Sequence, residues 1–413
     1  MTLIGSIRSG SWLTAGRLRA YSLIMLGLAA VAIVVWMGLA DGLVDRNGKP
    51  IGTDFSNVWA AGRLALEGRP EAVYDPVQHY AAQREAFGGR QVPFYGWHYP
   101  PLFLGVAALL ALLPYGPALA VWLAATLGAY LAAMRAILRG PELRMVMLIA
   151  LAYPAVFVNI GHGQNGFLTA ALLGGALVVL DRRPIVAGVL IGLLAYKPQF
   201  GVLIPLVLAA TGRWRSFAAA AVTVFCAAGL SALLFGAETW TAFLESTRFT
   251  RDVVLEAGGT GWEKIQSVFS AARSWGVPPG GAYALQGVTA VAVAAGLVRL
   301  WRSPAAYPLK AAALAVASLL ATPYVLDYDM TVMAVALAFF AAYGLERGFL
   351  PYEISGLAAV WASPLVARSV AGATLVPLGL VAMGLLFALI LRRGVHDDAA
   401  AEGYQRGESL VQA

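Results

Sequence analysis

The sequence predicts an all-α polytopic membrane protein, and its composition, its hydropathy and the placement of its charges each indicate this class. Of the 413 residues, 60% are hydrophobic and 12% are charged, with a mean hydropathy of +0.72. Soluble domains contain about 25% charged residues, well above this share. The net charge of +7 is concentrated at the ends of apolar segments, in line with the positive-inside rule, so we expect no nucleic-acid partner.

The N-terminal segment predicts a first membrane span that is retained in the protein. An apolar run from about Ala20 to Ala40 follows Arg8, Arg17 and Arg19, with no acidic residue before it. The run is long enough to cross the membrane, since about 20 apolar residues span the hydrocarbon core. No small-residue cleavage site follows closely, which argues against a signal peptide. The basic residues favour a cytoplasmic N-terminus.

Residues 41–97 form the most polar stretch of the chain, and their nearly balanced charges predict an outer loop. Within it, Asp54 begins an amphipathic helix, which we expect to lie flat on the membrane surface. Asp54 is either the cap of that helix or a catalytic carboxylate. Asp75 and Pro76 predict the start of a second short helix, where capping by Asp75 is the favoured role.

Further apolar runs predict the remaining helices of the membrane domain. Together with the first span they make about 11–13 hydrophobic helices, and some are too short to cross alone, because a span needs about 20 residues. The runs cover residues 98–113, 117–139, 145–159, 165–180, 184–197, 198–211, 215–235, 283–300, 306–321, 329–345, 353–370 and 372–391.

Arginine clusters at the ends of these runs predict the topology, since basic clusters remain in the cytoplasm. The loops 41–97 and 236–282, the turn 161–165, Lys197 and the segment 322–329 should then lie on the outer side. The clusters are Arg182-Arg183, Arg213 and Arg215, Arg299 and Arg302, and Arg392-Arg393.

Three further arginines conflict with strict alternation, which would place Arg135, Arg139 and Arg144 outside. The conflict disappears if one helix between residues 98 and 159 does not cross the membrane, and the short run 98–113 is the favoured one. We expect residues 1–393 to form a single integral membrane domain. Residues 394–413 predict a disordered cytoplasmic tail.

Polar residues among the apolar runs are the candidate functional residues, because ionisable groups at membrane depth are costly and usually face a cavity. Lys197 lies at a proline break between two apolar runs, where it either binds a lipid phosphate or snorkels toward the head groups. His162, Gln164 and Asn165 lie in a glycine-rich turn, which either binds substrate or is a tight helical connection.

A second polar cluster, Asp327-Tyr328-Asp329, lies at another outer helix end. It matches the Asp-x-Asp motif of metal-dependent sugar-nucleotide enzymes, but no alternating βα pattern accompanies it. Capping of the helix that begins near Asp329 is the favoured role for at least one of the two acids.

Metal and redox chemistry are not expected. His98, His162 and His396 do not have zinc-ligand spacing, and the single cysteine, Cys226, lies within an apolar segment. No glycine-rich phosphate loop follows a strand, and no Ser/His/Asp arrangement is evident. The sequence therefore predicts no cofactor and argues against conventional hydrolases and ATPases.

A set of short motifs resembles glycosyltransferase family 87, a group of GT-C-type integral membrane enzymes that includes polyprenol-phosphate-mannose-dependent mannosyltransferases. The resemblance covers most of residues 20–345, and it depends on the order and spacing of the motifs. These are Thr53-Asp54-Phe55, Gly68 to Tyr74-Asp75-Pro76, Tyr99-Pro100-Pro101, Gly163-Gln164-Asn165, Ala187-Gly188 to Lys197-Pro198, Arg213-Trp214-Arg215 and Thr322-Pro323-Tyr324.

The resemblance implies a GT-C-type bundle in the plasma membrane that transfers a monosaccharide, with mannose favoured, from a polyprenyl-phosphate carrier to a lipid or glycan acceptor. Transfer would occur at the outer face, with inversion, and Asp54 would match the family's catalytic base. Lys197 would stabilise the departing phosphate. Several relatives have histidine where this chain has Tyr328 and Asp329, so the resemblance assigns no second catalytic group. Further candidates for substrate binding are Arg63, Tyr99, His162, Gln164, Asn165, Asp327, Tyr328 and Asp329.

Two other classes of function are compatible with these features. A transporter or flippase would also be polytopic with sparse buried charges, but the polar loop 41–97 has no counterpart later in the chain, whereas transporters often contain repeated halves. A polymerase or ligase of lipid-linked glycans would use the same compartment and a similar lipid carrier.

Overall fold

The computed structural model describes residues 2–139 and 143–411, and within them the chain is a bundle of helices with no β-strand. The predicted all-α class is confirmed. Six helices are long and apolar enough to cross a membrane, or up to eight if two bent helix pairs each count as one span. The chain is therefore a multi-pass membrane protein.

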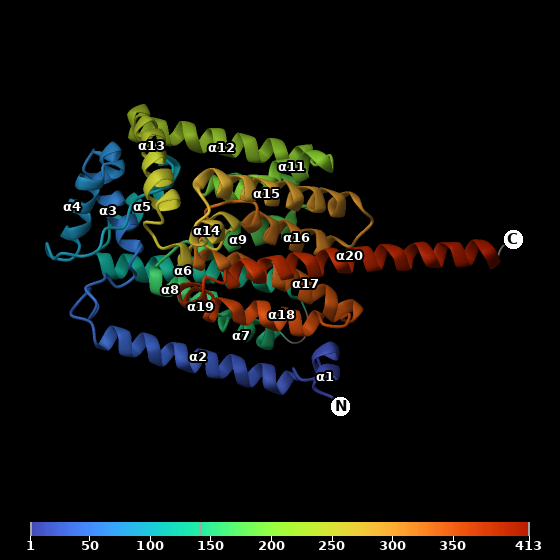
Figure 1. Cartoon of the computed structure of the whole chain (residues 1–413). Coiled ribbons are helices and arrows are strands. Elements are labelled where there is room, and N and C mark those ends of the chain that lie inside the picture. The colour runs from blue at the N-terminus through green and yellow to red at the C-terminus, as the bar shows by residue number, and fades with distance from the viewer. Residues whose placement is uncertain (1, 140–142, 412–413) are drawn as a thin grey trace.

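The long helices lie side by side along the bundle (Figure 1). They are α2 (Ala15–Gly38), α6 (Tyr115–Ile137), α12 (Trp214–Phe235), α15 (Pro279–Arg302), α17 (Met333–Arg347) together with the preceding short helix η7 (Asp327–Val332), and α20 (Leu378–Val411). The bent pairs are α7 (Leu143–Leu151) with α8 (Pro154–His162), at 49°, and α18 (Glu353–Ala362) with α19 (Ala367–Thr374), at 73°. Shorter apolar helices are α5 (Leu104–Ala111), α9 (Gly166–Val179), α10 (Pro184–Leu193), α11 (Leu203–Ala210) and α16 (Tyr307–Leu320).

Every apolar run predicted from the sequence contains one of these helices or bent pairs. Prolines at the first turn of α8, α10 and α15 explain several of the helix starts, because proline lacks the N–H group that has no partner there. The core follows α16 and α17, where almost every side chain is buried.

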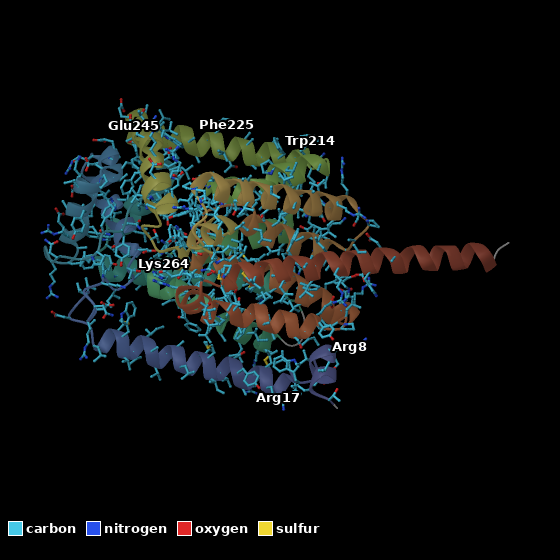
Figure 2. The ribbon with its side chains drawn as sticks, in the orientation of Figure 1. Arg8, Arg17, Trp214, Phe225, Glu245 and Lys264 are labelled. Carbon is cyan, nitrogen blue, oxygen red and sulfur yellow. The ribbon has the colours of Figure 1, made fainter. Side chains whose placement is uncertain are left out.

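One end of the bundle, here called the loop end, carries the polar segments that the sequence predicted as loops 41–97 and 236–282. It contains α3 (Phe55–Leu66), α4 (Pro76–Glu85) and α13 (Ala237–Phe249), whereas both termini lie toward the opposite end (Figure 1). Side chains labelled in Figure 2 show the same division, with Glu245 and Lys264 at the loop end and Arg8, Arg17 and Trp214 at the other.

The short helix α5 resolves the topological conflict of residues 98–159. Its eight residues extend about 12 Å, too little for a hydrocarbon core of about 30 Å, and it packs against α3. The next helix, α6, starts at the loop end, because the Tyr115 hydroxyl donates to the Ile51 carbonyl at 2.7 Å. Its 23 residues then place Arg135 and Arg139 about 35 Å away, toward the opposite end.

The apolar face of α3 is buried within the protein against α5 and α4, with Phe55, Ala61 and Leu64 almost inaccessible to solvent. At the other end of the chain, α20 continues as one helix to Val411. The segment 394–413, predicted from the sequence as a disordered tail, is thus helical as far as residue 411.

We predict that Gly62→Ala destabilises the loop end, because α3 and α5 approach too closely for a side chain at this position. A Cβ there would collide with the Ala107 carbonyl and lie 2.7 Å from the Ala111 Cβ. Overpacking of this kind costs about 1–3 kcal/mol, which a thermal unfolding assay in detergent would detect. Gly105→Ala on α5 is the matched control, since its Cβ would meet nothing within 4 Å. Equal melting temperatures for both variants would contradict this account.

Candidate functional site

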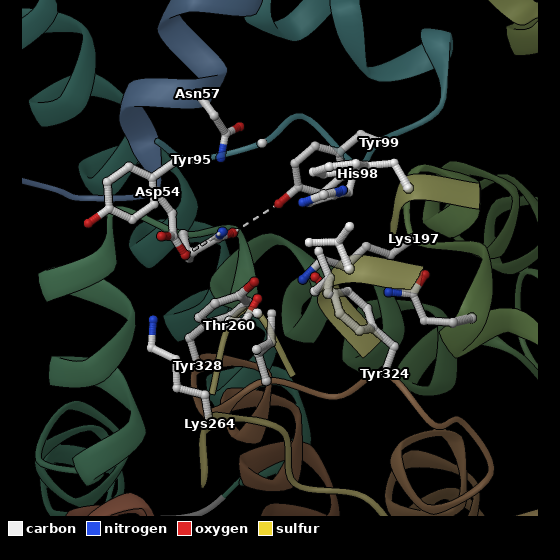
Figure 3. A pocket seen from close by; sticks show the side chains of 18 of the residues that line it. Asp54, Asn57, Tyr95, His98, Tyr99, Lys197, Thr260, Lys264, Tyr324 and Tyr328 are labelled. Carbon is white, nitrogen blue, oxygen red and sulfur yellow. Dashed lines mark hydrogen bonds between the residues drawn. The ribbon is translucent and has the colours of Figure 1, made fainter. Parts of the chain in front are cut away.

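A cavity of about 290 Å³ lies at the loop end, and segments far apart in the sequence form its walls (Figure 3). They are the start of α3, the stretch 94–99, the turn between α8 and α9, the Lys197 region, the segment 249–264 and the segment 324–328. Of the predicted site residues, the cavity is lined by Asp54, Tyr99, Gln164, Lys197 and Tyr328.

Asp54 directs its carboxylate into this cavity instead of capping α3. No backbone N–H of the helix donates to its side chain. Its Oδ2 accepts a hydrogen bond from Gln164 Nε2 at 3.0 Å and lies 3.9 Å from His162 Nδ1. His162 is in turn hydrogen-bonded to the Thr53 hydroxyl at 2.9 Å. The capping alternative for Asp54 is therefore wrong, and its carboxylate is available to a bound molecule.

Asp75, unlike Asp54, caps the helix that follows it. Its Oδ1 accepts from the backbone N–H groups of Val77 at 2.8 Å and Gln78 at 3.0 Å, and Pro76 is the first residue of α4. These hydrogen bonds, that of the Gln78 N–H first, lower the pKa of Asp75 below its usual value. The predicted helix cap is confirmed.

The Gln164 amide is held in one orientation by its neighbours. Its Oε1 accepts from the Tyr99 hydroxyl at 3.1 Å and from the Asn165 backbone N–H at 3.1 Å, which leaves Nε2 to face Asp54. Asn165 Nδ2 donates to the Tyr99 hydroxyl at 2.8 Å. Asn165 is buried behind the cavity and does not line it, so its contribution is to position Tyr99 and Gln164.

Lys197 is buried and forms an ion pair with Asp329, at 2.6 Å between Nζ and Oδ1. Its ammonium also lies 5.0 Å from the centre of the Tyr328 ring, within the range of cation–π contacts. The snorkelling alternative is wrong, because the side chain points into the protein and lines the cavity. Asp329 Oδ2 accepts from the Leu326 backbone N–H at 3.0 Å, which confirms a capping role for one of the two acids.

Three predicted residues lie away from the cavity or beside it. Arg63 is exposed and pairs with Glu67 on the surface of α3. Asp327 accepts from the Tyr328 backbone N–H and lies 3.7 Å from Arg368, so it supports the segment without lining the cavity. His162 is beside Asp54, and its ring centre is 5.8 Å from that of Tyr328.

Sequence reasoning did not single out several side chains that line the cavity, among them Asn57, Tyr95, His98 and Lys264. Burial lowers the pKa of His98 to about 4, and its Nδ1 is hydrogen-bonded to the Thr250 hydroxyl at 2.8 Å. His98 is therefore neutral near pH 7. Asn57 is buried, and its Oδ1 has no hydrogen-bond partner among the described residues. Asn57 is a polar residue about one helical turn after Asp54, and this spacing could have identified it from the sequence.

A metal site is not formed by the described residues, which contain no cluster of three or more His, Cys, Asp or Glu side chains suited to a metal ion. The two acids of the Asp-x-Asp motif instead contact protein groups, Lys197 and Arg368.

Comparison with known families decides the class of the protein. The sequence model of glycosyltransferase family 87 matches residues 97–323, more than half of the 413 residues. The chain belongs to glycosyltransferase family 87. This family 87 protein is a glycosyltransferase, which decides against the transporter alternative. No curated protein and no solved structure matches the chain.

The matched region of the family 87 protein includes Tyr99, Gln164, Lys197 and Lys264, whereas Asp54 precedes it. The cavity thus combines matched and unmatched parts of the chain. The site is built around Gln164, which joins Asp54 of the first loop to the matched helices.

We predict that Lys197→Ala destabilises the protein, because it leaves the buried Asp329 without its partner. Removing one member of a buried ion pair costs about 3–5 kcal/mol. The double variant Lys197→Met, Asp329→Asn should recover much of that stability. Thermal unfolding of the single and double variants in nanodiscs would reveal the coupling, and additive losses would contradict it.

We also predict that Asn57→Ala costs less thermal stability than Gln83→Ala, because no protein hydrogen bond to the Asn57 Oδ1 is lost. Gln83→Ala is the contrasting variant on the neighbouring helix. Gln83 Nε2 donates to Ser56 Oγ at 2.6 Å, and its Oε1 accepts from the Tyr95 N–H at 3.2 Å. Its loss should cost about 1–3 kcal/mol. A larger loss for Asn57→Ala than for Gln83→Ala would show that Asn57 has a structural role.

Proposed function

We propose that this family 87 enzyme transfers mannose from a polyprenyl-phosphate carrier to a hydroxyl of a lipid or glycan acceptor, with inversion, at the outer face of the plasma membrane. Asp54 is the general base in this proposal. The observation that carries it is the Asp54 carboxylate, which faces a cavity shared with buried Lys197 and makes no capping hydrogen bond.

A general base must reach the acceptor hydroxyl and retain a free acceptor atom. Gln164 occupies Asp54 Oδ2, and among the described residues no side chain or backbone N–H donates to Oδ1. Oδ1 is thus the atom that would accept the proton. Positioned general bases contribute about 10²- to 10⁴-fold to a reaction.

Inversion requires one displacement at the anomeric carbon, whereas retention by a covalent intermediate requires a carboxylate nucleophile in addition to the acid or base. Among the described residues that line the cavity, Asp54 is the one carboxylate. Asp329 is close by but is paired with Lys197. This composition supports the inverting reaction.

The polyprenyl phosphate leaves with an additional negative charge, which donors in the cavity must stabilise. Lys197 supplies three N–H bonds, one directed at Asp329 and the rest available to an oxygen in the cavity. Tyr328 also lines this space.

The outer location of the cavity is supported by the distribution of basic residues. Arg8 and Arg17 lie at the end of the bundle opposite to the cavity (Figure 2). Arg213 is at that end as well, since its guanidinium packs over Trp301 near the end of α15. By the positive-inside rule that end is cytoplasmic, and the cavity faces outward.

The direct test is incubation of the purified protein in nanodiscs with labelled polyprenyl-phosphate-mannose and a membrane lipid extract. Release of free polyprenyl phosphate together with a mannosylated acceptor would support the proposal. Transfer of an oligosaccharide from a polyprenyl diphosphate instead would identify a polymerase or ligase. Absence of both products, with several extracts, would contradict the proposed donor.

We predict that Asp54→Asn lowers mannose transfer by at least about 10²-fold, because the amide cannot accept the proton. Its thermal stability should remain close to wild type, since no helix cap is lost and Asn can still accept from Gln164. The measurement is initial-rate transfer in nanodiscs, with thermal unfolding of the same preparation.

Asp75→Asn is the matched control, because Asp75 begins a helix in the same loop but caps it. Asn caps about as well as Asp, so both activity and stability should be near wild type. Near-normal transfer by Asp54→Asn would remove Asp54 as the base.

A further inference from the structure

We propose that Lys264 binds the phosphate group of the donor, an inference that rests on the proposed function. Lys264 lines the cavity from the side opposite to the first loop, and Figure 3 shows its side chain directed into it. Within residues 2–139 and 143–411, no side chain forms an ion pair or hydrogen bond with its ammonium. It is a cation in the cavity without a protein partner.

The charges around the cavity explain why such a cation is needed. The charge of Lys197 is compensated by Asp329, and that of Arg368 is close to Asp327. His98 is neutral near pH 7. Without Lys264 the remaining charge would be the negative one of Asp54, which repels a phosphodiester.

Lys264 is held in place by the backbone on either side of it. It ends the short helix η6 (Trp262–Lys264), and the next residue, Ile265, pairs with Leu326 in an isolated antiparallel bridge. The Gln266 N–H donates to the Val325 carbonyl at 2.7 Å. Ile265 is buried, so the chain at Lys264 is anchored next to the segment that carries Tyr328.

The loop before Lys264 is also well packed. The Trp262 ring covers Gly258, which has a φ of +70°, and the Arg273 guanidinium lies 5.2 Å from the centre of the same ring. Arg273 further donates to the Glu256 and Val277 carbonyls. These contacts fix the direction from which Lys264 enters the cavity, as a phosphate-binding side chain requires.

In the reaction, the acceptor oxygen forms a bond to the anomeric carbon while the bond from that carbon to the phosphate oxygen breaks. The electron pair of the broken bond remains on the phosphate, and the acceptor proton passes to Asp54. Lys264 donates to the phosphate, whose charge grows during this step, so its contribution is larger in the transition state than in the bound donor.

The test compares Lys264→Gln with Lys264→Arg, which keeps the charge, and with Lys49→Gln, an exposed lysine of the first loop that does not line the cavity. We expect Lys264→Gln to lower kcat/KM for polyprenyl-phosphate-mannose about 10- to 100-fold, the range for a hydrogen bond to a charged group. It should weaken inhibition by free polyprenyl phosphate to a similar extent. Lys264→Arg should keep most of the wild-type kcat/KM and of the inhibition by free polyprenyl phosphate. Lys49→Gln should match wild type in both measurements.

Equilibrium binding separates this inference from the proposed function. Wild type should bind farnesyl phosphate more tightly than farnesol, as measured by tryptophan fluorescence, and Lys264→Gln should lose that preference with an unchanged melting temperature. The same binding result without any mannose transfer would contradict the proposed function but keep the phosphate site. Equal preference for farnesyl phosphate in Lys264→Gln and wild type, or none in wild type, would overturn the inference.

Discussion

The close approach of the α8–α9 turn to two other segments is the constraint on which the cavity depends. A Cβ on Gly163 would lie 2.6 Å from the Phe55 Cβ and 3.0 Å from the Gly52 carbonyl oxygen. A Cβ on Gly166 would lie 2.6 Å from the Tyr328 carbonyl oxygen. Only glycine permits these distances, and Gly163 also ends α8 in the left-handed conformation. Because the turn contacts the first loop and the Tyr328 segment together, Gln164 reaches Asp54, and the neighbouring His162 lies against Tyr328.

The polar groups at the loop end divide into those that hold the structure and those that remain available. Lys197 and Asp329 compensate each other, which offsets the desolvation that either charge would suffer alone. The Tyr99 hydroxyl donates to Gln164 and accepts from Asn165 Nδ2, although Asn165 Oδ1 has no partner among the described residues. Buried polar groups are normally hydrogen-bonded within the protein, so the exceptions indicate where a ligand belongs. Among the described residues that line the cavity, Asn57 Oδ1 is such an exception, and the partly exposed Asp54 Oδ1 and Lys264 ammonium also have no protein partner.

The apolar helices of the bundle could be predicted from the sequence because each depends on a local apolar run, whereas α13 lies in a segment predicted as a loop. The short run 98–113 and the arginines that follow it indicated that α5 does not cross the membrane. Lys197 and Gln164 could be predicted as cavity residues because they interrupt or separate such runs, whereas Asp54 was indicated by its place at the start of an amphipathic helix. The partner of Lys197 is 132 residues away, and no local pattern indicates that pairing. Lys264 lies in a loop without a periodic pattern, so its place in the cavity depends on the pairing of Ile265 with Leu326.

Arg63 illustrates an error that helical geometry could have prevented. It follows Asp54 by nine residues, which at about 100° per residue places it roughly 180° around the helix, on the face directed away from the cavity. Asn57 follows Asp54 by three residues and lies about 60° from it, on the same face. Counting rotation from a candidate catalytic residue therefore separates Asn57 from Arg63, although both are close to Asp54 in the sequence.

The proposed reaction also accounts for a carboxylate and a phosphate in one small cavity. Before transfer, Asp54 and the phosphodiester each carry one negative charge. After transfer, Asp54 is protonated and the phosphate carries both charges, so the total is unchanged while its centre moves toward the phosphate. A fixed cation on the phosphate side lowers the energy of that movement, and it does so most when no protein carboxylate compensates it. The charge of Lys197 is already compensated by Asp329, so Lys197 lowers this energy less. Lys264, which enters from the facing loop and has no carboxylate partner, lowers it more.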